Sequence, residues 1–194
     1  MQKKYKFTGK TIQHLGIELK QIQRLSDGLV GGYIEKEENL RHLGECFVFE
    51  NAQVFGNARV LENAQVYGNA KVLGYARVSG NAKVSGNAEV YGDARIYGNA
   101  RVWGNAKVYG DARVYGNAEV SKPQDCINIT GLRYNITLCP TFGHVGCKEF
   151  NIFELHDIKH EDYHEDYKDQ ISEEEFNDIK LIILTHYEYM LSKQ

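Results

Sequence analysis

Residues 90–120 have the sequence VYGDARIYGNARVWGNAKVYGDARVYGNAEV, in which a branched apolar residue returns at every sixth position. The same spacing extends back to Val48, and Ala follows four positions after each of the first twelve branched residues. Gly-Asn or Gly-Asp usually lies between them. The pattern predicts a solenoid over residues 48–121, with its branched residues at Val48, Val54, Val60, Val66, Val72, Val78, Val84, Val90, Ile96, Val102, Val108, Val114 and Val120.

Each hexapeptide combines one short strand with one turn. Ala, the next residue and Val are consecutive, so their side chains alternate inward, outward and inward as in a β-strand. Gly and Asn tolerate backbone angles that are closed to other residues, which places a corner at Gly-Asn. A small Ala and a branched Val therefore face a narrow core.

The consensus V-Y-G-N-A-x, as in Val66-Tyr67-Gly68-Asn69-Ala70-Lys71, resembles that of the hexapeptide-repeat proteins over the whole of residues 48–121. This resemblance implies a mainly β fold, a left-handed parallel β-helix with three hexapeptides in each triangular coil. The left-handedness comes from the resemblance alone, since general crossover rules predict the opposite hand. Twelve complete hexapeptides would give about four coils and a prism about 20 Å tall.

Flanking segments are expected to close the solenoid at both ends, because an open end exposes unpaired strand edges. We expect an N-terminal β cap at 1–46, the β-helix at 47–122, and a small C-terminal α+β domain at 123–194. β-like alternation occurs around Tyr5–Thr8 and Ile12–Leu19. Further strands are expected at Cys126–Thr130, Tyr134–Leu138 and His144–Phe150, before an amphipathic helix over Glu173–Leu191 with a capping box formed by Ser172 and Glu175.

Two flanking stretches carry a second resemblance. Gly28–Leu40, followed by Gly44-Glu45-Cys46-Phe47-Val48, is similar to the lead-in of hexapeptide-repeat proteins common in phages and prophages. Gly131-Leu132-Arg133-Tyr134-Asn135 is similar to C-terminal domains of phage solenoids. The resemblance implies a phage-encoded protein that acts in the host cytoplasm.

Composition narrows the functional classes. The chain has 194 residues and a net charge of −3, which does not favour duplex nucleic acid as a partner. We see no signal peptide and no apolar run of membrane-spanning length. Without a C-x-x-C spacing, Cys46, Cys126, Cys139 and Cys147 indicate reduced thiols in a cytosolic protein.

With three hexapeptides per coil, residues 18 apart stack on one face. One outward column then contains Arg59, Arg77, Arg95 and Arg113, whose guanidinium groups would lie about 4.8 Å apart and repel by just under 1 kcal/mol per pair even in water. Asp93 and Asp111 are candidates for partial compensation. The column is either an exposed charge ladder or half of a subunit interface, or it is a site for phosphate or carboxylate groups, which Arg binds bidentately.

Aromatic residues gather toward the C-terminal coils, at the position after each Val. Interleaved Arg and aromatic side chains suit a nucleobase with its phosphate, and they equally suit a protein–protein contact. Tyr at half-exposed strand ends also needs no functional explanation. The aromatic candidates are Tyr91, Tyr97, Trp103, Tyr109 and Tyr115.

The positions of the histidines do not favour a metal site or a catalytic base in the coils. His156, His160 and His164 are four residues apart, but their segment is strongly charged and matches no zinc motif, so we expect a solvated segment and no metal or cofactor. Residues 48–121 contain no His that could serve as a catalytic base. The other histidines, His14, His42, His144 and His186, also lie in the flanks.

Three functions remain open. The leading hypothesis is a non-catalytic, trimeric, phage-type protein that holds an anionic, nucleotide-like small molecule in Arg/Tyr clefts and sequesters a host immune signal. The second is an acyltransferase-like enzyme, which the hexapeptide resemblance implies, with His144 reaching an interface cleft. The third is a trimeric scaffold without a small-molecule ligand.

Overall fold

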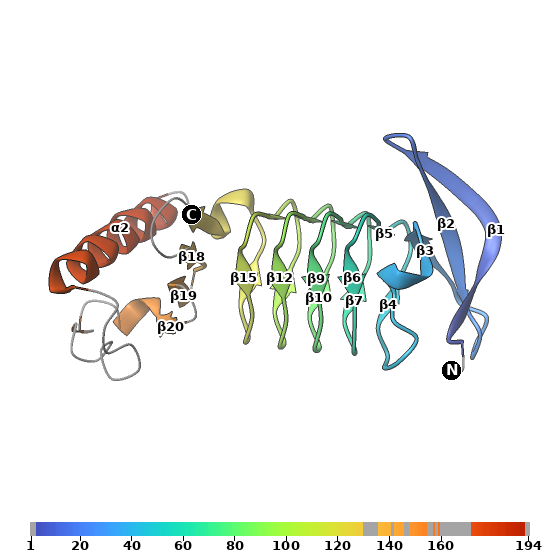
Figure 1. Cartoon of the computed structure of the whole chain (residues 1–194), viewed down its shortest axis with the longest axis horizontal. Coiled ribbons are helices and arrows are strands. Elements are labelled where there is room, and N and C mark those ends of the chain that lie inside the picture. The colour runs from blue at the N-terminus through green and yellow to red at the C-terminus, as the bar shows by residue number, and fades with distance from the viewer. Residues whose placement is uncertain are drawn as a thin grey trace.

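The centre of the protein is a β-solenoid in which short parallel strands stack coil upon coil (Figure 1). This computed structural model describes residues 3–129, 136–140, 142–145, 148–154, 157, 159 and 172–192. Each repeat contributes a two-residue strand that ends on the buried Val or Ile. The strands are β4 (Phe47–Val48), β5 (Gln53–Val54), β6 (Arg59–Val60), β7 (Gln65–Val66), β8 (Lys71–Val72), β9 (Arg77–Val78), β10 (Lys83–Val84), β11 (Glu89–Val90), β12 (Arg95–Ile96), β13 (Arg101–Val102), β14 (Lys107–Val108), β15 (Arg113–Val114) and β16 (Glu119–Val120).

Three parallel sheets form the faces of the prism. Strand pairs join residues 18 apart, as in Gln65↔Lys83 and Lys83↔Arg101. This register confirms three hexapeptides per coil. The face orders are β5-β8-β11-β14, β6-β9-β12-β15 and β4-β7-β10-β13-β16. The left-handed winding stays a prediction.

The solenoid has five coils where about four were expected. The additional coil is the first one. In it, β3 (Val30–Ile34) pairs in parallel with β5, Leu40 bridges to Val60, and β4 completes the turn. Residues Ile34 and Val54 are partners although they are 20 positions apart. Only β4 in this coil keeps the 18-residue spacing, and no Gly-Asn corner marks the segments before it, so the repeat pattern does not reveal the coil.

The core is as narrow as the pattern predicts. Every repeat Val, Ile96 and every repeat Ala is at most 2% exposed. Removal of these apolar groups from water supplies the main driving force for folding. At the N-terminal end the buried side chain of Asn39 closes this core, where its amide donates to the carbonyl oxygens of Gly56 and Ala58 at 3.1 and 2.9 Å.

The corners depend on glycine. Gly80 has φ +66°, and a Cβ there would lie 2.8 Å from the amide nitrogen of Gly98 in the next coil. Beside the glycines, Asn side chains form ladders along two corners, as between Asn81 and Asn99, where the amide nitrogen and oxygen are 3.1 Å apart. Close backbone approach at the corner is therefore what permits the coils to stack.

Gly80→Ala is expected to destabilise the protein more than Gly116→Ala does. Both residues have positive φ, which costs an Ala about 1–2 kcal/mol, but a Cβ at Gly116 would meet nothing within 4 Å. Melting temperatures from circular dichroism measure the difference. Equal losses in the two variants would contradict the proposed role of close coil contact.

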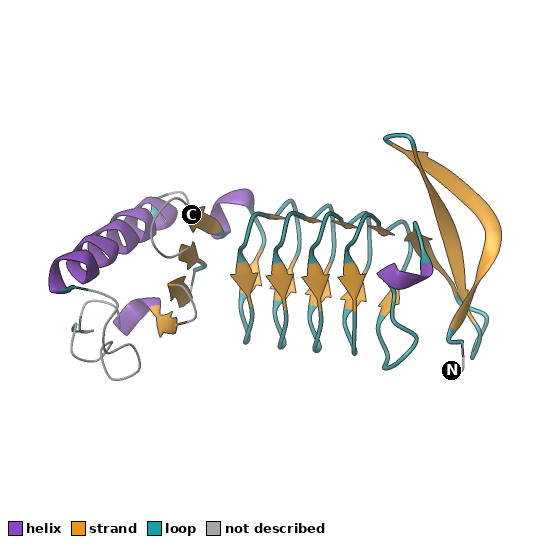
Figure 2. Cartoon of the chain, in the orientation of Figure 1, coloured by secondary structure: helices purple, strands orange, loops and turns teal. Residues whose placement is uncertain are grey.

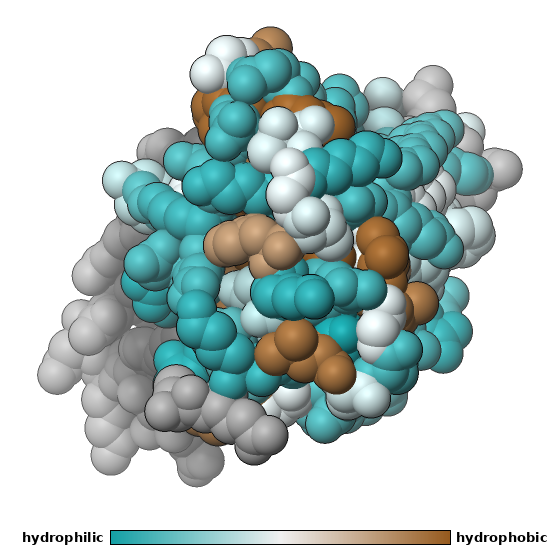
Figure 3. Space-filling view, turned by 90° about the vertical axis from the view of Figure 1, so that its right-hand side faces the viewer, coloured by the Kyte–Doolittle hydropathy of each residue, from teal (hydrophilic) through white to brown (hydrophobic). Residues whose placement is uncertain are grey.

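The N-terminal cap continues one face of the prism. Strands β1 (Tyr5–His14) and β2 (Ile17–Arg24) form an antiparallel hairpin that extends one face into the seven-stranded sheet β1-β2-β3-β5-β8-β11-β14 (Figure 2). The expected alternation over Ile12–Leu19 is interrupted, because Leu15 and Gly16 both have positive φ and form the hairpin turn. Viewed end-on, the cap is largely hydrophilic with separate apolar patches (Figure 3). Its exposed apolar residues include Leu25, Leu29, Val30 and Leu43.

Three glutamates secure the first coils at the three corners. Each carboxylate accepts a hydrogen bond from a corner glycine of the following coil. Hydrogen bonds to an ionised acceptor are stronger than neutral ones. The pairs are Glu35 with Gly56, Glu50 with Gly68 and Glu62 with Gly80, each 2.6 Å between carboxylate oxygen and amide nitrogen.

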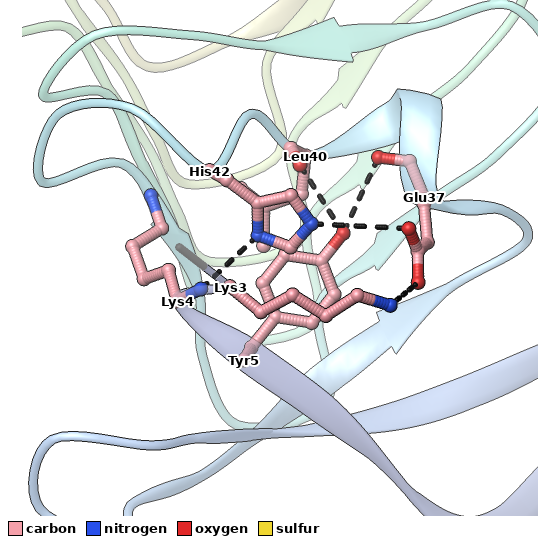
Figure 4. A network of polar contacts seen from close by, with 6 residues as sticks. All are labelled: Lys3, Lys4, Tyr5, Glu37, Leu40 and His42. Atoms are coloured by element: carbon pink, nitrogen blue, oxygen red, sulfur yellow. Dashed lines mark hydrogen bonds and ion pairs between the residues drawn. The ribbon is translucent and has the colours of Figure 1, made fainter. Parts of the chain in front are cut away.

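A buried tyrosine ties the start of β1 to the first coil (Figure 4). The Tyr5 hydroxyl lies 3.2 Å from the carbonyl oxygens of Glu37 and of Leu40 and shares its one proton between these two acceptors. Its ring stacks on His42 with 4.5 Å between the ring centroids. Burial raises the pKa of Tyr5, so the hydroxyl stays protonated and keeps its proton for donation. A hydrogen bond from Lys3 lowers the pKa of Glu37, which keeps this carboxylate charged beside His42.

Tyr5→Phe is expected to lower the free energy of unfolding by about 1–3 kcal/mol, because two partly buried carbonyl oxygens lose their donor. Tyr109→Phe is the matched control, since Tyr109 is 45% exposed and its change should cost little. Urea denaturation followed by circular dichroism measures both. Equal stability of Tyr5→Phe and the native chain would contradict the anchoring role.

A small C-terminal sheet closes the other end of the core. It has the order β17-β18-β19-β20, and Cys126, Cys139 and Phe142 belong to the same buried cluster as the coils. Both cysteines are free thiols, and the pKa of Cys139 is raised by its hydrogen bond with Cys126 and by burial. The elements are η1 (Glu37–Asn39) in the first coil, then η2 (Pro123–Asp125), β17 (Ile127–Ile129), β18 (Ile136–Leu138), β19 (Phe142–Val145), β20 (Lys148–Asn151), η3 (Ile152–Glu154) and α2 (Glu173–Leu191).

Helix α2 packs on this sheet through Ile183 and Met190, both of which are buried. The Ser172 hydroxyl accepts a hydrogen bond from the amide of Glu175 at 3.1 Å, which confirms Ser172 as the N-cap. Gly131–Asn135 and Cys147 lie outside the described residues. No described helix is long and apolar enough to cross a membrane. The domain limits at 46/47 and 122/123 stay predictions.

Candidate functional site

The four arginines lie in one column on the face formed by β6, β9, β12 and β15. Cα pairing joins Arg59 to Arg77, Arg77 to Arg95 and Arg95 to Arg113. The side chains of the first three are exposed, and that of Arg113 is half-buried. The column inferred from the 18-residue period is therefore present in the fold.

The other two faces contain acidic as well as basic side chains, and some of these form ion pairs. On the face of β5, β8, β11 and β14, Glu89 pairs with Lys107 at 3.5 Å, and on the third face Arg101 pairs with Glu119 at 3.3 Å. In the part of the chain that the structure describes, none of the four column arginines forms an ion pair. The parallel register therefore forms one ion pair on each of two faces and places only positive charge on the third.

A hollow adjoins the N-terminal half of this column. It has a volume of about 500 Å³, and its lining includes Lys36, Asn57, Arg59, Tyr75 and Arg77. The Tyr75 side chain is 62% exposed. Three cations, two amides and an exposed ring suit an anionic group attached to a planar ring, and the cations outnumber the Glu38 carboxylate that also lines the hollow.

Sequence reasoning missed this hollow although a signal was present. Among the twelve corner positions before the repeat Ala, Tyr75 is the only residue other than Asn or Asp. Lys36 comes from the irregular first coil, which the repeat pattern does not predict. Asn39 lines the hollow as well, so the cap contributes to it directly.

Two aromatic columns flank the C-terminal half of the arginine face. Tyr91 and Tyr109 stack at 5.3 Å between ring centroids on the corner before this face. Tyr97 and Tyr115 stack at 4.8 Å and 5° between ring planes on the corner after it. The structure thus brings four predicted tyrosines beside Arg95 and Arg113, and each of them uses one ring face to stack on its partner.

The remaining predicted aromatic lies elsewhere. Trp103 follows β13, on the corner after the third face, so the fold does not join it to the arginine column. Tyr115 also contacts Phe142 of the C-terminal sheet, with 5.3 Å between ring centroids. The aromatic residues that gather toward the C-terminal coils therefore lie in separate corner columns.

The histidines with described side chains have structural contacts. His42 accepts a hydrogen bond from the Lys4 amide at Nδ1, 3.2 Å away, and its Nε2 lies 3.9 Å from a Glu37 carboxylate oxygen. His14 packs against Phe55 and His186 Nδ1 contacts the carbonyl oxygen of Ile182. The described residues contain no group of His, Cys, Asp and Glu suited to a metal ion. His156, His160 and His164 and the side chain of His144 lie outside the described part, so those hypotheses stay predictions.

Four stretches of the coils match a known family of repeats, described as the YdcK Beta solenoid repeat. They are residues 52–68, 64–80, 94–110 and 106–121. The chain is a β-solenoid repeat protein. No curated protein matches this sequence. The match supports the architecture and carries no information on a ligand.

Arg77→Gln is expected to raise the free energy of unfolding by up to about 1–2 kcal/mol at low salt, because it removes repulsion from two stacked neighbours. The gain should shrink as salt screens the charges. Arg101→Gln is the matched control, since it removes an ion pair with Glu119 instead. Urea denaturation in low and high sodium chloride measures both. A stability change in Arg77→Gln that ignores salt would contradict this account.

Proposed function

We propose that this protein is a non-catalytic binding protein that holds an anionic, nucleotide-like small molecule against the arginine column. The observation that carries the proposal is the in-register stack of Arg59, Arg77, Arg95 and Arg113 without an ion pair in the described part of the chain. Such a stack is a cost to folding that a bound anion relieves. Tyrosines beside both halves of the column supply ring contacts for a base.

The proposed assembly is a homotrimer, in which arginine faces of neighbouring prisms border shared clefts. Direct contact between two such faces would oppose like charges across an interface, which is unfavourable without a bridging anion.

Sequestration of a host immune signal by a phage-encoded protein is the biological role that the resemblance suggests. Size-exclusion chromatography with light scattering tests the assembly, and a monomer would remove the shared clefts from the proposal.

The Arg59→Ala/Arg77→Ala and Arg95→Ala/Arg113→Ala double variants are expected to weaken nucleotide binding by about tenfold or more for each arginine that contacts phosphate, since a charged hydrogen bond contributes about 1.5–3 kcal/mol. A thermal-shift screen with nucleoside triphosphates, cyclic dinucleotides and acetyl-CoA selects the ligand, and calorimetry measures affinity. The two variants report separately on the hollow and on the tyrosine-flanked half.

The matched control is Lys71→Ala/Lys107→Ala, which removes the same charge from another face. Its affinity should stay within about twofold of the native value, apart from a salt-dependent steering effect. Unchanged binding in both arginine variants would overturn the site. Turnover of acetyl-CoA would instead support the acyltransferase alternative, and no shift with any compound would support a scaffold.

A further inference from the structure

One corner of the prism carries an interrupted aromatic column. Tyr67, Ser85 and Trp103 occupy the same position in three successive coils, each directly after the third face. The Tyr67 amide donates to Val84 at 2.9 Å and the Ser85 amide to Val102 at 2.8 Å, which holds the three residues in register. Two large aromatic side chains are therefore separated by one small one.

The other corners show what the interval between two coils accommodates. Aromatic rings in neighbouring coils stack at 5.3 Å in Tyr91–Tyr109 and at 4.8 Å in Tyr97–Tyr115. Tyr67 and Trp103 are two coils apart, so their backbones are separated by about 10 Å. That distance equals two stacking intervals. A planar ring at the level of Ser85 would stack on both aromatic side chains at once.

The space at this level is open to solvent. A groove of about 460 Å³ is lined by Tyr67, Ser85 and Trp103, and Trp103 is 47% exposed. Lys83, Arg101 and Glu119 line the same groove from the adjoining face, where Arg101 and Glu119 form an ion pair at 3.3 Å. The groove thus joins two ring faces to two cations, of which Lys83 has no ion pair within the described residues.

We propose that this groove binds a planar aromatic ring carrying an anionic substituent, with the ring between Tyr67 and Trp103 and the anion at Lys83 and Arg101. The ring takes the position that an aromatic residue would fill if Ser85 were replaced by one. The groove lies on a different face from the arginine column, so this inference does not depend on the function proposed above. Stacking on two aromatic faces and a cation beside the ring both favour such a ligand.

Trp103 is the only tryptophan of the chain, so its fluorescence reports on this groove directly. Adenosine monophosphate is the probe, with adenosine and inorganic phosphate as the two partial probes. Saturable quenching by adenosine monophosphate is expected, with a dissociation constant on the order of 1 mM or lower. Adenosine should bind more weakly and phosphate alone should not quench. A thermal shift without quenching would place the nucleotide elsewhere and overturn the proposal, as would equal quenching by adenosine.

Ser85→Tyr supplies the decisive variant, because it fills the gap by completing a stack of a kind that two other corners already contain. Binding measured by calorimetry and by Trp103 quenching should fall at least about tenfold. Ser79→Tyr is the matched control, since it adds the same ring beside Tyr97 on another corner and leaves the groove open. Circular dichroism verifies that both variants fold. Unchanged affinity in Ser85→Tyr, or an equal loss in Ser79→Tyr, would overturn the proposal.

Discussion

Backbone hydrogen bonds between neighbouring coils, which pair residues 18 apart, determine the rest of this structure. The amide of Arg77 donates to Ala94 and the amide of Arg95 donates to Ala112, and similar bonds continue along all three faces. Such short steps between coils require corners where two backbones nearly touch, and only glycine permits this at positions such as Gly80. The inward positions then accept only Ala and a branched Val or Ile, and each outward residue is fixed above its counterpart in the preceding coil.

This register determines which side chains lie next to one another on the surface, because residues 18 apart stack on the same face. On two faces the period places one acid beside a base, as for Glu89 with Lys107 and Glu119 with Arg101, which stabilises that step of the stack. On the third face it places Arg upon Arg, which folding alone does not favour. At the corners it stacks Tyr upon Tyr, or separates two rings by a single serine. Binding sites in such a fold therefore arise where the residues of a column do not satisfy one another by ion pairing or stacking.

The regular coils and the arginine column were predictable because both follow from one spacing. The first coil was not, since Ile34 and Val54 are partners across 20 residues and no Gly-Asn corner marks the chain between Leu40 and Val48. The capping carboxylates of Glu50 and Glu62 were equally hidden, because in sequence each only replaces a glycine with a residue that rarely adopts positive φ. The hollow beside Tyr75 was not predictable from the repeat, because Lys36 in its lining comes from the irregular first coil. Predicting that Trp103 lies away from the arginines requires the geometry of the coil, because the composition of the coils does not reveal it.

The two ends of the prism are unlike each other, and the coils between them are nearly interchangeable. Each additional block of 18 residues would displace the hairpin from the helical domain by about 4.8 Å while leaving both junctions intact. The length of the solenoid can therefore change only by whole coils. Shortening or extending it would tune how far apart two dissimilar modules stand, and would shorten or extend every surface column in the same step.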